Sequence, residues 1–306
     1  MKYHFIVNPK SRSGKGKLIW ELLEPEINKR AIEKEVHMTQ YRRHAVNIAR
    51  DISSRGEEAA IVVLGGDGTI NEVINGIVDF EKVTLGYLPA GSGNDLARGL
   101  GLKRDPLAAL EVILNPGEIK PIDIGLMTRA GKERRFAVST GMGFDAAVCH
   151  QAAVSKIKDL LNKLKIGKLT YVSIALQRLY NDPAVPVRVV LDDGITHMFE
   201  KTYFAAVMNT PFEGGGFKFC PEADCADGKL NVIIVSGISK LQALRILPTA
   251  FKGNHVRFRG VTIYQCEKAS IQADRPMMIH TDGEPVFPRR KIEVEVIAGK
   301  LKMIIA

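Results

Sequence analysis

The chain has 306 residues, 45% of them apolar and 25% charged, a balance that indicates a globular protein of about two domains. Uninterrupted apolar runs such as Ala59–Leu64 are far shorter than the ~20 residues of a membrane-spanning helix, which excludes a bilayer-crossing segment of that kind. The net charge of +9 favours an anionic partner, unless it only keeps the surface solvated.

The beginning of the chain lacks the pattern of a secretory signal. Residues 1–7 reach Asn8-Pro9 too soon to hold an apolar signal region, and no small-residue cleavage site follows. We therefore expect a cytoplasmic protein. There are four cysteines and no CxxC pair, so buried free thiols are expected rather than a disulfide or a zinc site: Cys149, Cys220, Cys225 and Cys266.

The first 120 residues alternate β-type runs with helical patterns, which predicts an α/β domain with a parallel sheet. Strands are predicted at 3–7, 35–38, 59–64 and 84–88. Helices are predicted at 16–32, 45–55, 71–78, 94–100 and 106–114.

After residue 120 most runs are β-type, which predicts a β-sandwich domain over residues 121–289. Strands are predicted at 121–127, 136–140, 185–191, 202–207, 230–235, 261–264 and 269–273. Helical segments are predicted near 168–180 and 240–251. The runs at 292–297 and 301–305 could complete the sandwich or return to the first domain, so residues 290–306 are assigned to neither. The fold class is thus α/β plus all-β.

A glycine-rich turn, Gly65-Gly66-Asp67-Gly68-Thr69, follows the apolar strand at 59–64. Glycines let backbone N–H groups approach a phosphate closely at a helix start. Asp67 could order a hydrated Mg²⁺, and Thr69 could cap the helix or donate to phosphate. The alternative is an ordinary strand-to-helix turn with a capping aspartate.

Two further loops are predicted at the same edge of the sheet, because each follows a parallel strand. Residues 89–95 (PAGSGND) come after the strand at 84–88, and residues 8–16 (NPKSRSGKG) come after the first strand. Ligands bind at the carboxyl ends of such strands. The first loop is not a Walker A motif, since GxxxxGK[ST] is absent. Together the loops predict an ATP-dependent phosphotransferase.

The order of motifs resembles the catalytic domain of the diacylglycerol kinase and sphingosine kinase family, and is closest to its soluble bacterial lipid kinases. The motifs that carry the resemblance are Asn8-Pro9, GGDGTINEVINGI (65–77), GSGND (91–95), IDIG (122–125), GGG (214–216), PEA (221–223), DGKL (227–230) and DGE (282–284). The resemblance implies an α/β nucleotide domain followed by a β-sandwich, and transfer of the γ-phosphoryl group of ATP to a lipid hydroxyl, with diacylglycerol as the expected acceptor.

The resemblance also implies a set of ligand contacts. A structural Mg²⁺ would be held by Asp224, Asp227 and Lys229, for which an ordinary Asp-Gly turn is the alternative. The first loop departs from the family's Asn-Pro-x-Ser-Gly, so either Lys10 or Lys15 could approach the phosphates. ATP contacts are expected from Asn8, Pro9, Lys10, Ser11, Arg12, Thr39, Gly65, Gly66, Asp67, Gly68, Thr69, Ile70, Asn71 and Ser92.

Two carboxylates are the expected catalytic residues. Glu284 resembles the family's proton acceptor, although a solvated glutamate in a hairpin turn is the alternative. Asp67 is expected to handle Mg-ATP, and Asp123 could join its water and metal network or be a turn residue. The seven histidines show no HExxH or other tight metal spacing and are assigned no role.

The expected partner is a lipid at an anionic bilayer, reached by peripheral association with the inner face of the membrane. The segment 156–168 has the pattern of an interfacial helix or equally of a core-packing helix. No nucleic acid is expected, because aromatic residues make up 7% of the chain and no recognition motif is present. A homodimer is one of the oligomeric states left open. The alternatives are an NAD kinase-like enzyme and a non-catalytic nucleotide-sensing module that docks on membranes.

Overall fold

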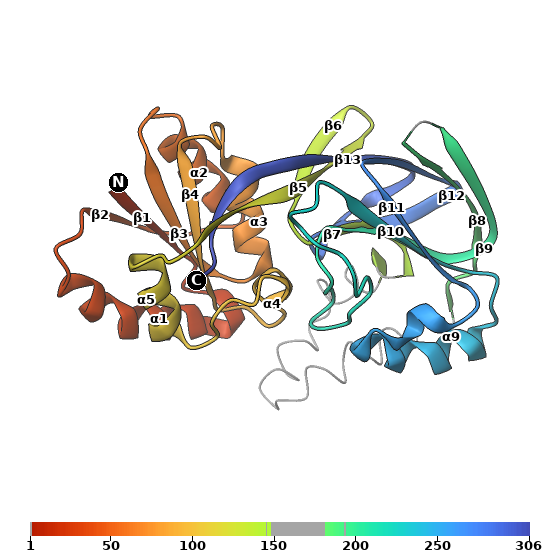
Figure 1. Cartoon of the computed structure of the whole chain (residues 1–306), viewed down its shortest axis with the longest axis horizontal. Helices are drawn as coiled ribbons and strands as arrows, with labels where there is room; N and C mark the ends of the chain where they lie inside the picture. Colours follow the sequence, from red (N-terminus) through yellow and green to blue (C-terminus); the bar gives the residue numbers. More distant parts are fainter. Residues whose placement is uncertain (1, 145, 148–180, 193) are drawn as a thin grey trace. The chain divides into compact units, whose positions relative to one another are not determined.

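The computed structural model describes residues 2–144, 146–147, 181–192 and 194–306. The chain forms two compact units, one made of Met1–Ile124 with Ile297–Ala306 and the other of Gly125–Val296 (Figure 1). The sequence-based boundary after residue 120 falls inside strand β5 (Ile119–Arg129). The helices expected at 156–168 and 168–180, together with Cys149, lie outside the described residues.

The first unit contains a parallel sheet. Its strands lie in the order β2-β1-β3-β4, and the end of β13 (Glu284–Ile304) pairs in parallel with β4. The last residues therefore return to the first unit, which the sequence left open. The bounds are β1 (Lys2–Val7), β2 (Lys34–Met38), β3 (Ala59–Gly65) and β4 (Val83–Pro89).

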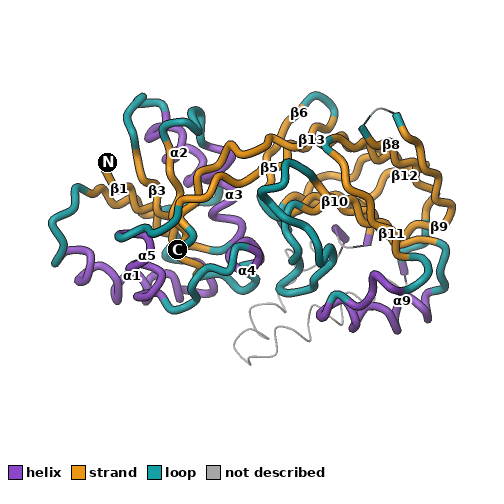
Figure 2. The backbone as a smooth tube through the Cα atoms, in the orientation of Figure 1, coloured by secondary structure: helices purple, strands orange, loops and turns teal. Residues whose placement is uncertain are grey.

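Helices lie on both faces of this sheet, as Figure 2 shows. On one face, α1 and α5 pack through Trp20, Leu23 and Leu110 against strand residues such as Phe5 and Val62. The helices α2 and α3 pack on the other face, which explains why β3, covered on both sides, is an unbroken apolar run. The bounds are α1 (Ser11–Asn28), α2 (His44–Ser53), α3 (Asp67–Gly76), α4 (Asp95–Gly99) and α5 (Pro106–Leu114).

The first turn of α1 is not regular helix. Arg12, Ser13 and Gly14 have φ values of 44°, 56° and 97°, in the left-handed region. The regular helix therefore begins after Gly14, close to the start predicted at residue 16. At Gly16 a methyl group would lie 2.2 Å from the carbonyl oxygen of Asn8, so the helix start is pressed against the loop after β1.

The second unit is β-rich, with strands in the order β11-β10-β9-β7-β12-β13 and with β8 pairing both β9 and β12. Alternate residues of β8, namely Val185, Val187, Val189 and Leu191, enter its main apolar core. The bounds are β6 (Lys132–Phe136), β7 (Ser139–Gly143), β8 (Val185–Leu191), β9 (Ile195–Met208), β10 (Leu230–Ser236), β11 (Val261–Cys266) and β12 (Lys268–Thr281).

Four predicted elements after residue 120 were wrong in detail. The run at 136–140 is split between β6 and β7, because the backbone amides of Ala137 and Val138 bond to the Asp282 carboxylate instead of a strand. The runs at 292–297 and 301–305 are parts of the single long strand β13. The helix at 240–251 is α9 (Lys240–Ile246) followed by the 3₁₀ turn η1 (Leu247–Lys252), since Pro248 has no N–H for an α-helical bond.

A second 3₁₀ turn, η2 (Asn254–Arg257), follows η1. The cysteines Cys220, Cys225 and Cys266 are buried free thiols, as expected. Among the described helices, none combines the length and the apolar character needed to cross a membrane.

Candidate functional site

The loops after β1 and β3 are joined by a side-chain hydrogen bond. Asn8 Nδ2 donates to Thr69 Oγ1 over 2.9 Å, and the Asn8 backbone amide donates to the carbonyl of Leu64. The other side-chain group of Asn8, Oδ1, accepts from the backbone amide of Lys10. One asparagine therefore fixes both the path of its own loop and the first turn of α3.

The loops after β3 and β4 approach each other through glycines. A methyl group added at Gly91 would lie 2.6 Å from Gly66 Cα, so neither loop has room for a side chain at the crossing. The backbone amide of Ala90 donates to the carbonyl of Gly65 over 2.6 Å. Gly65 is itself packed against Thr69, whose side chain a methyl group would meet at 2.5 Å. The three loops of the sequence prediction thus meet at one edge of the sheet.

This edge has the features of an anion site. Gly66 lies in extended backbone at the N-cap of α3, and Asp67 is in the first helical turn. The free N–H groups and the dipole of a helix start attract negative charge. At the start of α1, three residues after Asn8, the buried hydroxyl of Ser11 has no hydrogen-bond partner among the described residues. A buried hydroxyl without a partner costs free energy, so a ligand oxygen that accepts its proton would bind favourably.

The remaining expected ATP contacts differ in exposure. Ser92, Lys10 and Arg12 are exposed, whereas Ile70 and Asn71 are buried at 2% and 1% exposure inside α3. Buried residues of this kind support the helix start rather than offer surface to a ligand. Three more positions complete the set: Pro9 on the loop after β1, Gly68 in the first turn of α3, and Thr39, whose amide donates to the carbonyl of Val7. Lys15, the alternative to Lys10, is exposed in α1.

Asp67 connects two of the loops. Its Oδ1 accepts from the backbone amide of Leu96 over 3.3 Å, at the start of α4. Asp95 beside it forms an ion pair with Arg98 at 2.7 Å. Asp67 as a whole is half-buried at this junction.

Tyr87 is a residue of this edge that the sequence analysis missed. Its side chain is buried, its hydroxyl has no hydrogen-bond partner among the described residues, and burial together with Asp67 and Asp95 holds its pKa well above the usual range. The phenol therefore stays protonated and is a potential donor. The only sequence signal was a tyrosine near the end of a strand that leads to the site.

In the second unit, Glu284 follows a tight turn between β12 and β13. Asp282 and Gly283 have φ values of 48° and 74°, and Thr281 pairs with Glu284 across the turn. The Asp282 carboxylate accepts three buried backbone amides at 2.9–3.0 Å, from Ala137, Val138 and Ser139. The glutamate is half-buried and is carried on a firmly anchored turn.

A buried hydrogen bond between a histidine and a glutamate supports the same turn and was not predicted. His280 Nε2 lies 3.1 Å from Glu213 Oε1, and both side chains are at most 5% exposed. The backbone amide of Gly283 donates to His280 Nδ1 over 3.3 Å. Glu213 directly precedes the three glycines of the GGG motif, so the pair links that loop to the turn of Glu284. Sequence spacing held no signal for a contact between residues so far apart.

The residues expected to hold a structural Mg²⁺ lie on an exposed turn. Asp224 Oδ1 accepts from the amide of Ala226, and Asp227 Oδ1 accepts from the amide of Lys229. Each carboxylate keeps further acceptor sites, and two carboxylates with a backbone carbonyl are oxygen donors that suit Mg²⁺.

Asp123 has a structural contact within the first unit. Its Oδ1 accepts from the amide of Gly299 over 2.7 Å, and its side chain is buried. This bond fixes the end of β13 beside β5. It gives Asp123 a supporting role in the fold.

The second unit also contains an apolar pocket between β9, β10, α9 and η1. Its volume is about 40 Å³. Its polar groups are the Tyr203 hydroxyl, which donates to the Ile238 carbonyl, and the ring of His255. The lining is otherwise apolar and includes Phe144, Phe204, Phe219, Val235, Ile246 and Leu247. Such a lining suits an apolar group.

Comparison with known proteins agrees with this architecture. Residues 2–127 match the model of the diacylglycerol kinase catalytic domain, and residues 138–305 match that of the YegS C-terminal NAD kinase beta sandwich-like domain. A diacylglycerol kinase of Mycobacterium tuberculosis is 29% identical over 249 residues, covering 80% of this chain and 76% of the relative. A diacylglycerol kinase of Bacillus subtilis is 29% identical over 251 residues, covering 79% and 78%.

The fold has a solved counterpart. The crystal structure of a diacylglycerol kinase from Bacillus anthracis superposes with a TM-score of 0.72 at 19% identity, covering 100% of this chain and 97% of that one. At this identity the superposition supports the fold alone. The two family models together span nearly the whole sequence. The chain therefore belongs to the diacylglycerol kinase family, with a catalytic domain followed by a YegS-type β-sandwich domain.

Proposed function

We propose that the chain is an ATP-dependent lipid kinase that transfers the γ-phosphoryl group to a lipid hydroxyl, with diacylglycerol as the first acceptor to test. The observation that carries the proposal is the meeting of the loops of Asn8, Gly66 and Gly91 at one edge of the parallel sheet. The names of the relatives support it, since both are called diacylglycerol kinase.

In this proposal the phosphates of ATP lie against the three loops. The glycine crossing has no side chain that would hold a phosphate away from the backbone, and the start of α3 favours an anion. Ser11 gains the acceptor that its hydroxyl lacks in the free protein. Asp67 orients the water shell of the metal that accompanies ATP, while its bond to Leu96 holds it in place. Bound Mg²⁺ would neutralise charge on the phosphates during transfer.

Glu284 is proposed to accept the proton of the lipid hydroxyl. A general base must hold its position to within hydrogen-bonding distance of the proton that it removes. The three hydrogen bonds accepted by Asp282 and the hydrogen bond from the Gly283 amide to His280 supply that rigidity.

We propose that Asp224, Asp227 and the backbone carbonyl of Lys229 hold a structural Mg²⁺ that stiffens the neighbouring loop.

The acceptor is proposed to be a lipid because of the apolar pocket and the net charge. The pocket lined by Phe204 and Phe219 offers a lining that suits an apolar group of the acceptor. A net charge of +9 favours contact with anionic headgroups. We therefore propose that the enzyme works while bound peripherally to the inner face of the membrane.

The test is an acceptor screen. Purified protein is incubated with Mg-ATP labelled at the γ-phosphate and with phosphatidylcholine vesicles that carry diacylglycerol, phosphatidylglycerol, undecaprenol or a sphingoid base, each with and without anionic lipid. We expect labelled lipid from diacylglycerol vesicles, with a higher rate when anionic lipid is present. Glu284→Gln should abolish most of the product, whereas Glu293→Gln, an exposed glutamate on the same strand, should not.

Other outcomes would overturn the proposal. Phosphorylation of NAD without any labelled lipid would identify an NAD kinase-like enzyme. Binding of ATP without transfer to any acceptor would identify a nucleotide-sensing module. Equal product from Glu284→Gln and the parent protein would remove Glu284 from its proposed role.

A further inference from the structure

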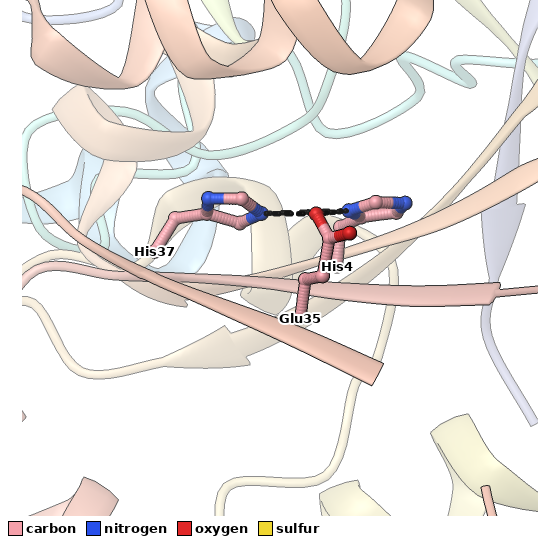
Figure 3. Close-up of side chains that lie close together, drawn as sticks. All are labelled: His4, Glu35 and His37. Carbon is pink, nitrogen blue, oxygen red and sulfur yellow. Dashed lines mark hydrogen bonds and ion pairs between the residues drawn. The ribbon is translucent and has the colours of Figure 1, made fainter. Parts of the chain in front are cut away.

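Three potential metal ligands meet on adjacent strands of the first unit. His4 lies on β1, and Glu35 and His37 lie on β2. His4 and Glu35 are register partners of the parallel pair, and His37 is two residues beyond Glu35, so all three side chains lie on one face of the sheet. Figure 3 shows a contact from each of the two imidazole rings to the same oxygen of the Glu35 carboxylate.

The distances between the three ligand atoms form a nearly equilateral triangle. His4 Nδ1 lies 3.4 Å from Glu35 Oε2 and 3.4 Å from His37 Nε2, and His37 Nε2 lies 3.5 Å from the same Glu35 oxygen. Zinc–nitrogen bonds of about 2.0–2.1 Å at tetrahedral angles separate two ligands by about 3.3–3.4 Å. An octahedral or square-planar ion with bonds of about 2.0–2.1 Å would need neighbouring ligands only about 2.9 Å apart. The triangle therefore matches one face of a tetrahedral site.

The ligand types select the ion. Two imidazoles and one carboxylate suit Zn²⁺ and similar transition metals, whereas Mg²⁺ and Ca²⁺ prefer oxygen ligands. His4 is 3% exposed, while Glu35 and His37 are about one-third and one-quarter exposed. The partly open side leaves room for water as a fourth ligand.

Two basic side chains, Lys2 and Arg55, contact the carboxylate of Glu35. Lys2 Nζ lies 2.6 Å from Glu35 Oε1, the oxygen that faces away from the triangle. Hydrogen bonds of this kind commonly orient a ligating carboxylate.

Arg55 opposes a bound cation. Its Nη1 lies 3.3 Å from Glu35 Oε2, the oxygen that belongs to the triangle. Its positive charge lowers the affinity for a metal ion, although Glu33, 3.4 Å from Lys2, offsets part of the local positive charge. Removal of the Arg55 guanidinium should therefore strengthen metal binding, which can be tested separately.

We infer that His4, Glu35 and His37 form a binding site for one Zn²⁺ ion or a similar tetrahedral transition-metal ion. The ion would join β1 to β2 close to where these strands lead into Asn8 and Thr39, two of the expected ATP contacts. Its role would be to stabilise the edge of the sheet rather than to take part in phosphoryl transfer. The spacing of these three residues in the sequence did not indicate a metal site, because β1 and β2 become neighbours only in the folded chain.

The test measures metal binding directly. Protein freed of any polyhistidine tag and of bound metal is titrated with Zn²⁺ in competition with a chromophoric chelator, and with Co²⁺ followed by its visible absorption, which is stronger for tetrahedral than for octahedral coordination. We expect one ion per chain and a tetrahedral Co²⁺ spectrum. His37→Gln and Glu35→Gln should each weaken binding at least tenfold, whereas His197→Gln, a half-buried histidine of β9, should leave it unchanged. Arg55→Gln should tighten it.

Thermal unfolding gives an independent readout. Addition of Zn²⁺ should raise the Tm of the parent protein and of His197→Gln but not that of His37→Gln, since only binding to the folded state stabilises it. The absence of stoichiometric binding would overturn the inference. So would binding that His37→Gln and Glu35→Gln leave intact, or an affinity that falls in Arg55→Gln.

Discussion

The crossing of the loops after β3 and β4 can be tested by one methyl group. In Gly91→Ala the new Cβ would lie 2.6 Å from Gly66 Cα and 2.7 Å from Asn94 Oδ1. Carbon atoms in van der Waals contact are about 3.5–4.0 Å apart, so the two loops must separate by roughly 1 Å. Backbone conformation is not the obstacle, because positive φ does not occur at this glycine.

The separation has two expected costs. It strains the hydrogen bonds from Ala90 N to Gly65 O, at 2.6 Å, and from Gly91 N to Asn94 Oδ1, at 2.8 Å. At about 0.5–1.5 kcal/mol each, their loss lowers the free energy of unfolding by about 1–3 kcal/mol. A misplacement of about 1 Å at a catalytic site commonly lowers the rate on the order of 100-fold. We therefore expect a modest loss of stability and a large loss of turnover.

Three measurements check this expectation: urea unfolding, calorimetric titration with a non-hydrolysable ATP analogue, and lipid phosphorylation. Gly117→Ala is the matched control in the same unit, because its new Cβ would make only an ordinary contact at 3.5 Å with the carbonyl oxygen of Ala306. If Gly91→Ala binds the analogue and turns over as the control does, the loops do not form the phosphate site.

Four further predictions follow from single residues. Glu284→Gln should bind ATP normally but lose most turnover, because an amide cannot accept the proton; equal turnover in a lipid kinase assay would contradict this. Asp67→Asn should weaken binding of Mg-ATP in calorimetric titration, and an unchanged affinity would exclude Asp67 from that role. Asp282→Ala should lower the free energy of unfolding by about 3 kcal/mol or more, since three buried amides lose their acceptor; a change below about 1 kcal/mol in urea unfolding would refute that account. Burial lowers the pKa of His255 below its ordinary value of about 6.5, so the unfolded chain takes up a proton that the fold resists, and stability should fall as the pH drops below that value; His255→Gln should flatten this part of a pH series of unfolding measurements, and an equal slope would contradict it.

The loops after β1, β3 and β4 were predictable from the sequence because their residue patterns are local. Gly65–Thr69 is a contiguous motif, and parallel strands place the loops that follow them at one edge. The sequence pattern therefore indicated that the loop of Asn8 lies near the loop of Thr69. It did not indicate which atoms meet, since the bond from Asn8 Nδ2 to Thr69 Oγ1 depends on how the first turn of α3 is placed.

Contacts between distant parts of the chain were not predictable in this way. The pair of Glu213 and His280 joins a loop to a strand, and the triangle of His4, Glu35 and His37 depends on the register of β1 against β2. The split of the run at 136–140 has the same origin, because its amides bond to Asp282 far along the chain. Periodicity reports only which face a residue occupies, not its partner on another strand.

The turn of Glu284 shows how backbone strain and hydrogen bonding are balanced at a candidate catalytic residue. Asp282 occupies the left-handed region, which is unfavourable for most side chains but is tolerated by aspartate and asparagine. Its carboxylate accepts three backbone amides, and charged acceptors form the stronger hydrogen bonds. The strain is therefore offset locally, by bonds that also fix the direction of the chain at Gly283. A glutamate placed directly after such a turn has little freedom at its backbone, which is what a general base requires if it is to meet one hydroxyl reproducibly.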